Sequence, residues 1–154
     1  MSNQITVRKS GIVDVDSGKN VVIYEPVNLY GCILEDDVFI GPFVEIQKNT
    51  RIGQGTKIQS HCFICEYVVI GNNCFIGHNV TFVNDLFKNG YPDSDRANWQ
   101  HTVLHDGVSI GSGSTLLAVE ICAGTVIGAG SVVTKNITVK GVYAGNPAKL
   151  LRKL

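Results

Sequence analysis

Two polar side chains six residues apart are the first candidates for chemistry in this sequence. His78 follows Ile76–Gly77, and Asn84 is followed at once by Asp85. An imidazole titrates near neutral pH, so His78 could act as a general base or could only line a binding site. The amide oxygen of Asn84 can accept a hydrogen bond from an amine but cannot take its proton at neutral pH. A turn-forming role is the structural alternative for Asn84.

The composition narrows the class of protein. The 154-residue chain has 13 basic and 13 acidic side chains, which argues against a general nucleic-acid binder. The odd number of cysteines argues against a disulfide framework. No apolar run approaches the ~20 residues of a membrane span, and the polar N-terminus lacks the apolar stretch of a signal peptide. We therefore expect a cytoplasmic protein with one domain over residues 1–154 and no nucleic-acid or membrane partner.

Large apolar residues recur at every sixth position, and this period predicts the fold. Glycine often follows the large residue directly. The large series is Leu34, Ile40, Ile46, Ile52, Ile58, Ile64, Ile70, Ile76 and Phe82. Four places after each member stands a mostly small or β-branched residue: Val38, Val44, Thr50, Thr56, Cys62, Val68, Cys74, Val80 and Leu86.

A period of six fits neither a helix nor simple strand alternation. It fits a short strand followed by a tight turn, with three such units making one triangular coil. Each strand then stacks on the strand three units later at ~4.8 Å, and both residue series point into the interior. Glycine would relieve the turn, where a side chain or a negative φ is awkward. The pattern predicts an all-β chain of stacked coils.

Two interruptions break the period. Residues at about 87–102 have no register and contain turn-forming residues, which predicts a projecting loop. The single Trp99 favours a loop that folds back onto the protein. Later, Ile121 follows Leu116 by five residues instead of six, so one corner of that coil is tightened. The sequence offers no functional reason for the shorter unit.

The repeats resemble the hexapeptide-repeat acyltransferases, over roughly residues 28–133. That family forms a left-handed parallel β-helix. The segment Val142–Lys149, Val-Tyr-Ala-Gly-Asn-Pro-Ala-Lys, resembles the closing signature of members that use acetyl-CoA, and Ile127–Ile137 resembles the motif before it. The resemblance implies acetyl-CoA as the cosubstrate beside a C-terminal tail at about 134–154. Candidate cofactor contacts are Lys135, Lys149 and Arg152 for the phosphates, and Gly111, Ala118 and Ala129 for close approach.

A narrower resemblance rests on Ile40–Gln47 and on Ile76–Asp85 with the loop that follows. Both are similar to N-acetyltransferases that act on nucleotide-linked aminosugars, especially dTDP-linked 3-amino-3,6-dideoxyhexoses. A related group acts on a UDP-linked 3-amino sugar. The resemblance implies a homotrimer with the sugar site between subunits, and a product for a surface glycan such as lipopolysaccharide. Acetylation of a sugar hydroxyl and a non-catalytic scaffold are the alternatives.

The same resemblance assigns roles to single residues. It implies that Asn84 holds the sugar amine in a mechanism poor in enzyme bases, with His78 as a base or as a lining residue. Further substrate-contact candidates are His61, Asp85, Glu66 and Trp99. Asp85 and Glu66 are expected on outer faces of the coil, as is Glu45. For Glu45 and Glu66, an exposed side chain without a role in binding is the simpler interpretation.

A metal site is the competing interpretation of the four histidines. β-Helical carbonic anhydrases bind zinc through three histidines, the last two five residues apart. Here His101 and His105 are four apart, and we expect structural roles for both. Cys62 and Cys65 have a metal-like spacing, but Cys62 occupies a small inward position and fits a core thiol better. We expect no bound metal.

Overall fold

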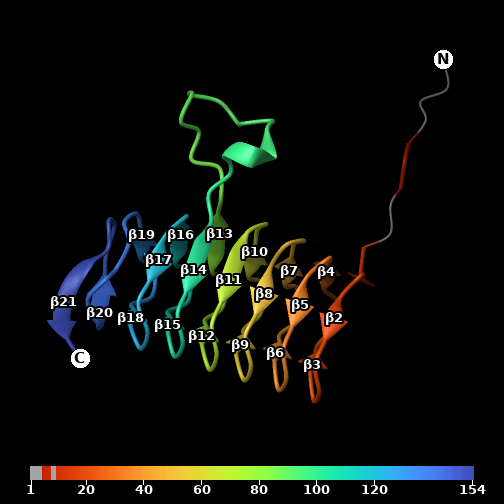
Figure 1. Cartoon of the computed structure of the whole chain (residues 1–154), viewed down its shortest axis with the longest axis horizontal. Helices are drawn as coiled ribbons and strands as arrows, with labels where there is room; N and C mark the ends of the chain where they lie inside the picture. The colour runs from red at the N-terminus through yellow and green to blue at the C-terminus, as the bar shows by residue number, and fades with distance from the viewer. Residues whose placement is uncertain (1–4, 8–9) are drawn as a thin grey trace.

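The computed structural model describes residues 5–7 and 10–154, whose strands wind into a column of stacked coils (Figure 1). Each complete coil gives one strand to each of three sheets, and strands of successive coils pair in parallel. Glu45, for example, pairs with Phe63, one full coil of 18 residues later. The fold is an all-β solenoid of about seven turns, consistent with a left-handed β-helix of hexapeptide repeats, and the predicted fold class is confirmed.

The strands of the described residues are short, and only the last two of the third sheet reach four or five residues. The first sheet holds β1 (Ile12–Val13), β4 (Asn28–Tyr30), β7 (Glu45–Ile46), β10 (Phe63–Ile64), β13 (Thr81–Val83), β16 (Thr115–Leu117) and β19 (Val132–Val133). The second holds β2 (Asp16–Ser17), β5 (Ile33–Leu34), β8 (Arg51–Ile52), β11 (Val68–Ile70), β14 (Thr102–Leu104) and β17 (Glu120–Ile121). The third holds β3 (Val22–Ile23), β6 (Phe39–Ile40), β9 (Lys57–Ile58), β12 (Phe75–Ile76), β15 (Ser109–Ile110), β18 (Val126–Ile127), β20 (Gly141–Ala144) and β21 (Lys149–Lys153). Strand β21 pairs antiparallel with β20.

The interior of the column is formed by the two predicted residue series. Every member of the large series is at most 1% exposed, and the small series is buried from Val38 to Val80. Buried hydroxyls are satisfied locally: Thr56 donates to the carbonyl oxygen of Gly71 at 2.8 Å. Leu86, expected in the small series, is 38% exposed instead. The prediction was wrong there because the chain leaves the coil after Val83, before the position of Leu86.

The glycine after a large residue is required by coil stacking and not by its own φ. A Cβ on Gly77 would lie 2.6 Å from the backbone nitrogen of Ser112 in the next coil. The positive φ falls two residues later in the unit, as at Asn79 (φ 56°) and His61 (φ 64°). Of the two reasons expected for glycine, steric clearance is therefore the one that applies at Gly77.

Variation in coil length is concentrated at the corner between the first and second sheets. The five-residue unit from Leu116 to Ile121 turns there, with Ala118 at φ 47°. A matching five-residue unit turns at the same corner between Leu29 and Leu34. The projecting loop also leaves there, after β13, and returns at β14, so it spans residues 84–101 (Figure 1).

The column also begins before residue 28, where the resemblance to the repeats starts, since β1 already pairs with β4. The loop contains a single turn of 3-10 helix, η1 (Arg96–Asn98), which is the one helical element of the described residues. Among these residues no helix has the length and apolar character needed to cross a membrane.

Four buried thiols predict a pH-dependent stability. Burial raises the pKa of Cys32 and Cys62 to about 11 and that of Cys65 to about 12. An unfolded thiol ionises near pH 9, so above that pH the unfolded state binds fewer protons than the folded state. The contribution of these thiols to the free energy of unfolding should therefore be constant below pH 9 and fall between pH 9 and 11, by roughly 3 kcal/mol for each thiol held near 11.

Urea titrations at several alkaline pH values measure this slope. Cys65→Ala should be less stable than wild type at every pH, and its free energy of unfolding should fall less steeply as the pH rises above 9. In the folded protein at pH 8, a thiol reagent should modify the half-buried Cys122 quickly and the four buried thiols only on unfolding. Rapid modification of all five thiols would contradict the burial.

Candidate functional site

The candidate residues lie at two different corners of the coil. We call the corner between the first and second sheets, where residues 84–101 leave, the loop corner. We call the corner between the third and first sheets, which contains His61 and His78, the histidine corner. One crossing of the first sheet, residues 80–83, separates His78 from Asn84, and four extended residues span on the order of 13 Å. A single chain therefore does not bring His78 and Asn84 together.

Asn84 sits at the base of the loop, where the last coil residue meets the coil below. Its side-chain nitrogen donates to the backbone oxygen of Glu66 at 3.2 Å, and its own backbone oxygen accepts from Gln100 at 2.8 Å. These two contacts fix both ends of the loop and the orientation of the Asn84 amide. No hydrogen bond reaches the amide oxygen from the part of the chain that the structure describes, so this oxygen can accept one from a ligand.

Glu66 differs from the expectation of an outer, solvated side chain. The residue is only 4% exposed, because the loop of the next coil folds over it. Its Oε1 lies 3.3 Å from Arg96 of η1, while its Oε2 is buried without a hydrogen-bond partner. The Arg96 guanidinium lies 5.6 Å from the centre of the Trp99 ring. The loop is therefore held to the coil by charge as well as by backbone contacts.

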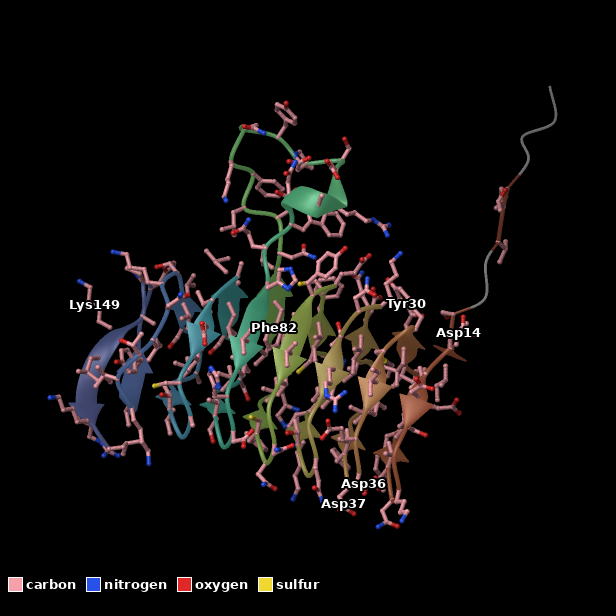
Figure 2. The ribbon with its side chains drawn as sticks, in the orientation of Figure 1. Asp14, Tyr30, Asp36, Asp37, Phe82 and Lys149 are labelled. Atoms are coloured by element: carbon pink, nitrogen blue, oxygen red, sulfur yellow. The ribbon has the colours of Figure 1, made fainter. Side chains whose placement is uncertain are left out.

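Polar side chains of the coils below extend this cluster. Glu45 accepts hydrogen bonds from Asn28 and Gln47, both at 3.1 Å. Gln47 in turn accepts from the backbone nitrogen of Glu66 at 3.3 Å. Tyr30 lies on the side of the column from which the loop projects (Figure 2). Partial burial and then the charges of Glu45 and Glu66 raise the pKa of the Tyr30 phenol, which keeps it a neutral donor.

The loop is internally ordered by aspartates. Asp85 accepts from the backbone nitrogens of Phe87 (2.9 Å) and Asp93 (2.7 Å). The Trp99 indole donates to the Asp93 backbone oxygen at 3.0 Å, which is a contact within the loop. Between the loop and the first sheet runs a groove of about 330 Å³ whose lining includes Phe63, Asn84, Asp85, Phe87 and Trp99.

The histidine corner is an exposed surface. His78 Nδ1 is 2.9 Å from the Ser60 hydroxyl, and its backbone nitrogen donates to Ser112. His61 stacks on Phe43, with ring centres 4.8 Å apart. An imidazole held by one hydroxyl has its other nitrogen free, which suits either a base or a lining group.

The cofactor candidates are divided among several places. Gly111 and Ala129 belong to the histidine corner, and Ala118 lies at the loop corner, where its backbone nitrogen donates to Val83 at 3.1 Å. Lys149 and Arg152 are exposed on β21, and Lys135 is exposed after β19. The five-residue unit thus places Ala118 directly beside the base of the loop. The tightened corner of this coil therefore lies next to the groove.

The remaining histidines and cysteines make structural contacts. His101 packs on Tyr67 with ring centres 5.0 Å apart, and His105 Nε2 lies 2.8 Å from Glu120. Cys62 donates to the Gly77 backbone oxygen from within the core. Within residues 5–7 and 10–154, no three His, Cys, Asp or Glu side chains are placed to hold a metal ion.

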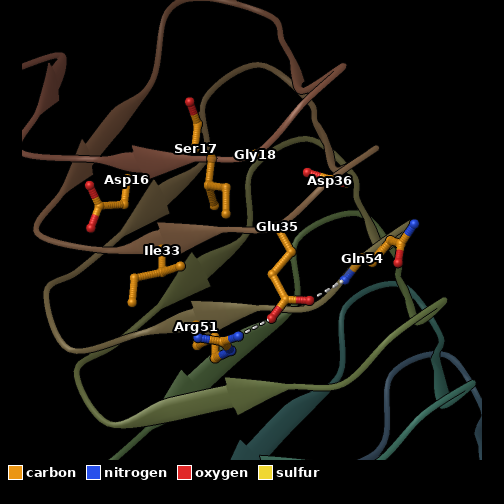
Figure 3. A pocket seen from close by; sticks show the side chains of 9 residues that line it. Asp16, Ser17, Gly18, Ile33, Glu35, Asp36, Arg51 and Gln54 are labelled. Atoms are coloured by element: carbon orange, nitrogen blue, oxygen red, sulfur yellow. Dashed lines mark hydrogen bonds and ion pairs between the residues drawn. The ribbon is translucent and has the colours of Figure 1, made fainter.

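A depression of about 530 Å³ lies on the second sheet near the N-terminal end, away from both corners (Figure 3). Its charged lining consists of Asp16, Asp36 and an ion pair between Glu35 and Arg51. Glu35 also accepts a hydrogen bond from the backbone nitrogen of Gln54 at 3.1 Å. This carboxylate is satisfied by its own neighbours, in contrast to Glu66.

Sequence-family models match the coils on both sides of the loop. A model described as bacterial transferase hexapeptide (six repeats) matches residues 31–66 and 49–84, and one described as hexapeptide repeat of succinyl-transferase matches 103–135. These segments are the coils whose interior is described above. The chain belongs to the hexapeptide-repeat family.

Among curated relatives, this hexapeptide-repeat chain is 33% identical over 161 residues to the bifunctional protein GlmU of Thermotoga maritima, covering 92% of this chain and 34% of that protein. The chain thus spans about a third of that relative's length. A hexapeptide-repeat acetyltransferase of Vibrio cholerae complexed with acetyl coenzyme A superposes with a TM-score of 0.69 at 24% identity, over 80% of this chain and 71% of the other.

A single-residue mutant of perosamine N-acetyltransferase from Caulobacter crescentus, in complex with CoA and GDP-perosamine, gives a TM-score of 0.62. It is 21% identical, and the match covers 92% of this chain and 57% of the other. At these identities the likeness of both structures shows the fold.

Several residues of the site were not foreseen from the sequence, chiefly Arg96, Tyr30 and Gln47. The sequence did contain one signal for contacts between coils. Residues at the same place in successive coils are 18 positions apart, and Glu66 stands 18 positions before Asn84, which it contacts. The same step joins Ser60 to His78 and Phe43 to His61. Arg96 had no such signal, because the loop has no register.

Proposed function

We propose that this protein is an acetyl-CoA-dependent N-acetyltransferase whose acceptor is a nucleotide-linked aminosugar. The observation that carries the proposal is Asn84 at the base of the groove, with its amide nitrogen engaged by Glu66 and its oxygen free. Membership of a family whose models describe transferases supports the acyl-transfer chemistry. The neighbours with acetyl coenzyme A, and with CoA and GDP-perosamine, support the two substrates.

The reaction needs an oriented amine, stabilisation of an oxyanion and an exit for a proton. The neutral amine attacks the thioester carbonyl, the C–N bond forms, the C–S bond breaks, and coenzyme A leaves as thiolate. The proton lost by the nitrogen passes to that thiolate or to water. Asn84 accepts a hydrogen bond from the amine and so aims its lone pair, without taking the proton. His78 of a neighbouring copy would line the acceptor or take the proton.

The acceptor we propose is a dTDP-linked 3-amino-3,6-dideoxyhexose for surface glycan synthesis in the cytoplasm. A UDP-linked 3-amino sugar is the nearest alternative. The groove combines aromatic and apolar surface (Phe63, Phe87, Trp99) with polar groups at its base, as expected for a deoxysugar with one apolar edge.

The direct test is acetyl transfer from acetyl-CoA, followed through the released thiol, with dTDP- and UDP-linked 3-amino sugars. The matched control carries a hydroxyl in place of the amine. We expect turnover with an amine only, unchanged after treatment with EDTA. Turnover of the hydroxyl sugar would favour O-acetylation, and no binding of acetyl-CoA by calorimetry would favour a non-catalytic scaffold.

We further predict a homotrimer with sites between neighbours. Within one chain His78 and Asn84 face different corners, so a shared site requires the histidine corner of one copy against the loop corner of the next. Closed three-fold association of a prism satisfies this for every copy. Sedimentation equilibrium at micromolar concentration should give three times the chain mass of 16.6 kDa. A monomer with full activity would contradict a shared site.

A further inference from the structure

The unfilled oxygen of Glu66 is the least explained polar group of the described residues. Oε2 is buried and has no hydrogen-bond partner, whereas Oε1 faces Arg96. A buried carboxylate oxygen without a donor loses its hydration and gains nothing in exchange. Native proteins rarely keep such an atom unless water, an ion or a ligand fills it.

The neighbours of Glu66 are already engaged. The Asn84 amide nitrogen donates to the Glu66 backbone oxygen, and the Gln47 side-chain nitrogen donates to Glu45. The one cation paired with it among the described residues, Arg96, lies at 3.3 Å, longer than the ~2.7–2.9 Å of a well-formed charge-assisted bond. Its side chain is 52% exposed and belongs to the loop. Arg96 is therefore a replaceable cation, held at one oxygen only.

The position of Glu66 connects it to the acceptor. Its backbone oxygen accepts a hydrogen bond from the Asn84 amide nitrogen, and its chain neighbour Cys65 lines the groove beside Asn84. The Glu66 side chain is not itself part of that lining. Glu45 adds a second negative charge to the same cluster, so with Arg96 the three charged groups sum to one excess negative charge. Such a cluster favours a ligand group that is cationic and rich in hydrogen-bond donors.

We propose that Glu66 binds the ammonium form of the acceptor's amino group, in place of Arg96, and delivers it to Asn84. This inference rests on the proposed function and makes Glu66 the residue that selects an amine over a hydroxyl. The ammonium fills the free Oε2 and exchanges one cation for another at the carboxylate. It then loses one proton to water, and the neutral amine held by Asn84 attacks the thioester. A sugar hydroxyl offers one neutral donor and no charge, so it cannot replace Arg96 at equal gain.

Calorimetry with the full-length protein measures the selection directly. The probes are the dTDP-linked 3-amino sugar and its 3-hydroxy counterpart, with wild type, Glu66→Gln and the matched control Glu35→Gln. Glu35 also pairs with an arginine, but it lines the depression on the second sheet, away from both corners (Figure 3). We expect Glu66→Gln to weaken binding of the amine by about 10- to 100-fold, with the hydroxyl sugar and acetyl-CoA unchanged. Glu35→Gln should bind all three as wild type does.

The pH dependence and a second variant complete the test. Wild type should bind the amine more tightly as pH falls through the titration of the sugar ammonium, and Glu66→Gln should lose this trend. Arg96→Ala removes the resident cation and also one contact between the loop and the coil, so its amine affinity is measured relative to its affinity for the 3-hydroxy sugar. This ratio should be at least that of wild type, so this variant decides even if Glu66→Gln does not fold.

Three results would overturn the inference. The first is equal amine binding by wild type and Glu66→Gln, as expected if water alone fills the site. The second is tighter amine binding with rising pH. The third is a lower ratio of amine affinity to hydroxyl-sugar affinity in folded Arg96→Ala than in wild type. If neither sugar binds to wild type, the proposed function fails together with the inference. If the amino sugar is acetylated but Glu66→Gln binds it as tightly as wild type does, the proposed function stands and only the inference fails.

Discussion

Asn84→Ala should lower kcat for acetyl transfer by roughly 30- to 1000-fold, a loss of about 2–4 kcal/mol of transition-state stabilisation. The alanine removes the oxygen that orients the amine. It also removes the 3.2 Å contact to Glu66, so the loop loses one of its contacts with the coil. Affinity for acetyl-CoA should change little. Steady-state kinetics and calorimetry with acetyl-CoA separate the two quantities.

The matched control for Asn84 is Asn89→Ala, an exposed asparagine of the same loop, which should keep near-normal kcat. His78→Ala distinguishes the two roles left open for the histidine. If His78 only lines the site, His78→Ala should lower kcat less than Asn84→Ala does, and the pH–rate profile should still follow the ionisation of the substrate amine. If Asn84→Ala turns over normally while His78→Ala abolishes a limb near pH 6–7, the histidine is the base and our assignment is wrong.

Gly111→Ala should destabilise the fold by about 3 kcal/mol, or roughly 6–12 °C in Tm for a chain of this size. A Cβ at position 111 would lie 2.4 Å from the backbone nitrogen of Ala129 and 2.7 Å from the carbonyl carbon of Gly128. Both atoms belong to the backbone of the next coil, so no side chain can rotate away. Thermal unfolding followed by circular dichroism measures the shift.

Gly113→Asn is the appropriate control for that substitution. Gly113 has φ 71° with no atom within 4 Å of its Cβ position, and Asn79 holds the same place of the unit at φ 56°. Asparagine tolerates this conformation, so Tm should change by less than a third as much. An equal loss at both positions would show that conformational freedom, and not coil spacing, requires Gly111.

The coil itself was predictable because its physics is local and repeated. Leu34 to Phe82 stand at a strict six-residue period, and a register that buries one residue in each unit leaves few other arrangements. The position of Asn84 beside Glu66 also follows from the 18-residue coil, once the coil is accepted. Leu86 was misplaced because the period gives no sign of where the chain leaves the last strand before the loop.

The sequence by itself determined the all-β coil, its buried series, the existence of a loop and the family to which these repeats belong. Only the tertiary structure decided that Glu66 is buried and that Arg96 faces it, because an irregular loop has no period from which its contacts can be read. It also decided that His78 and Asn84 lie at different corners. Six residues are a short distance along the chain, but an extended strand lies between His78 and Asn84, so the two residues stand beyond its opposite ends.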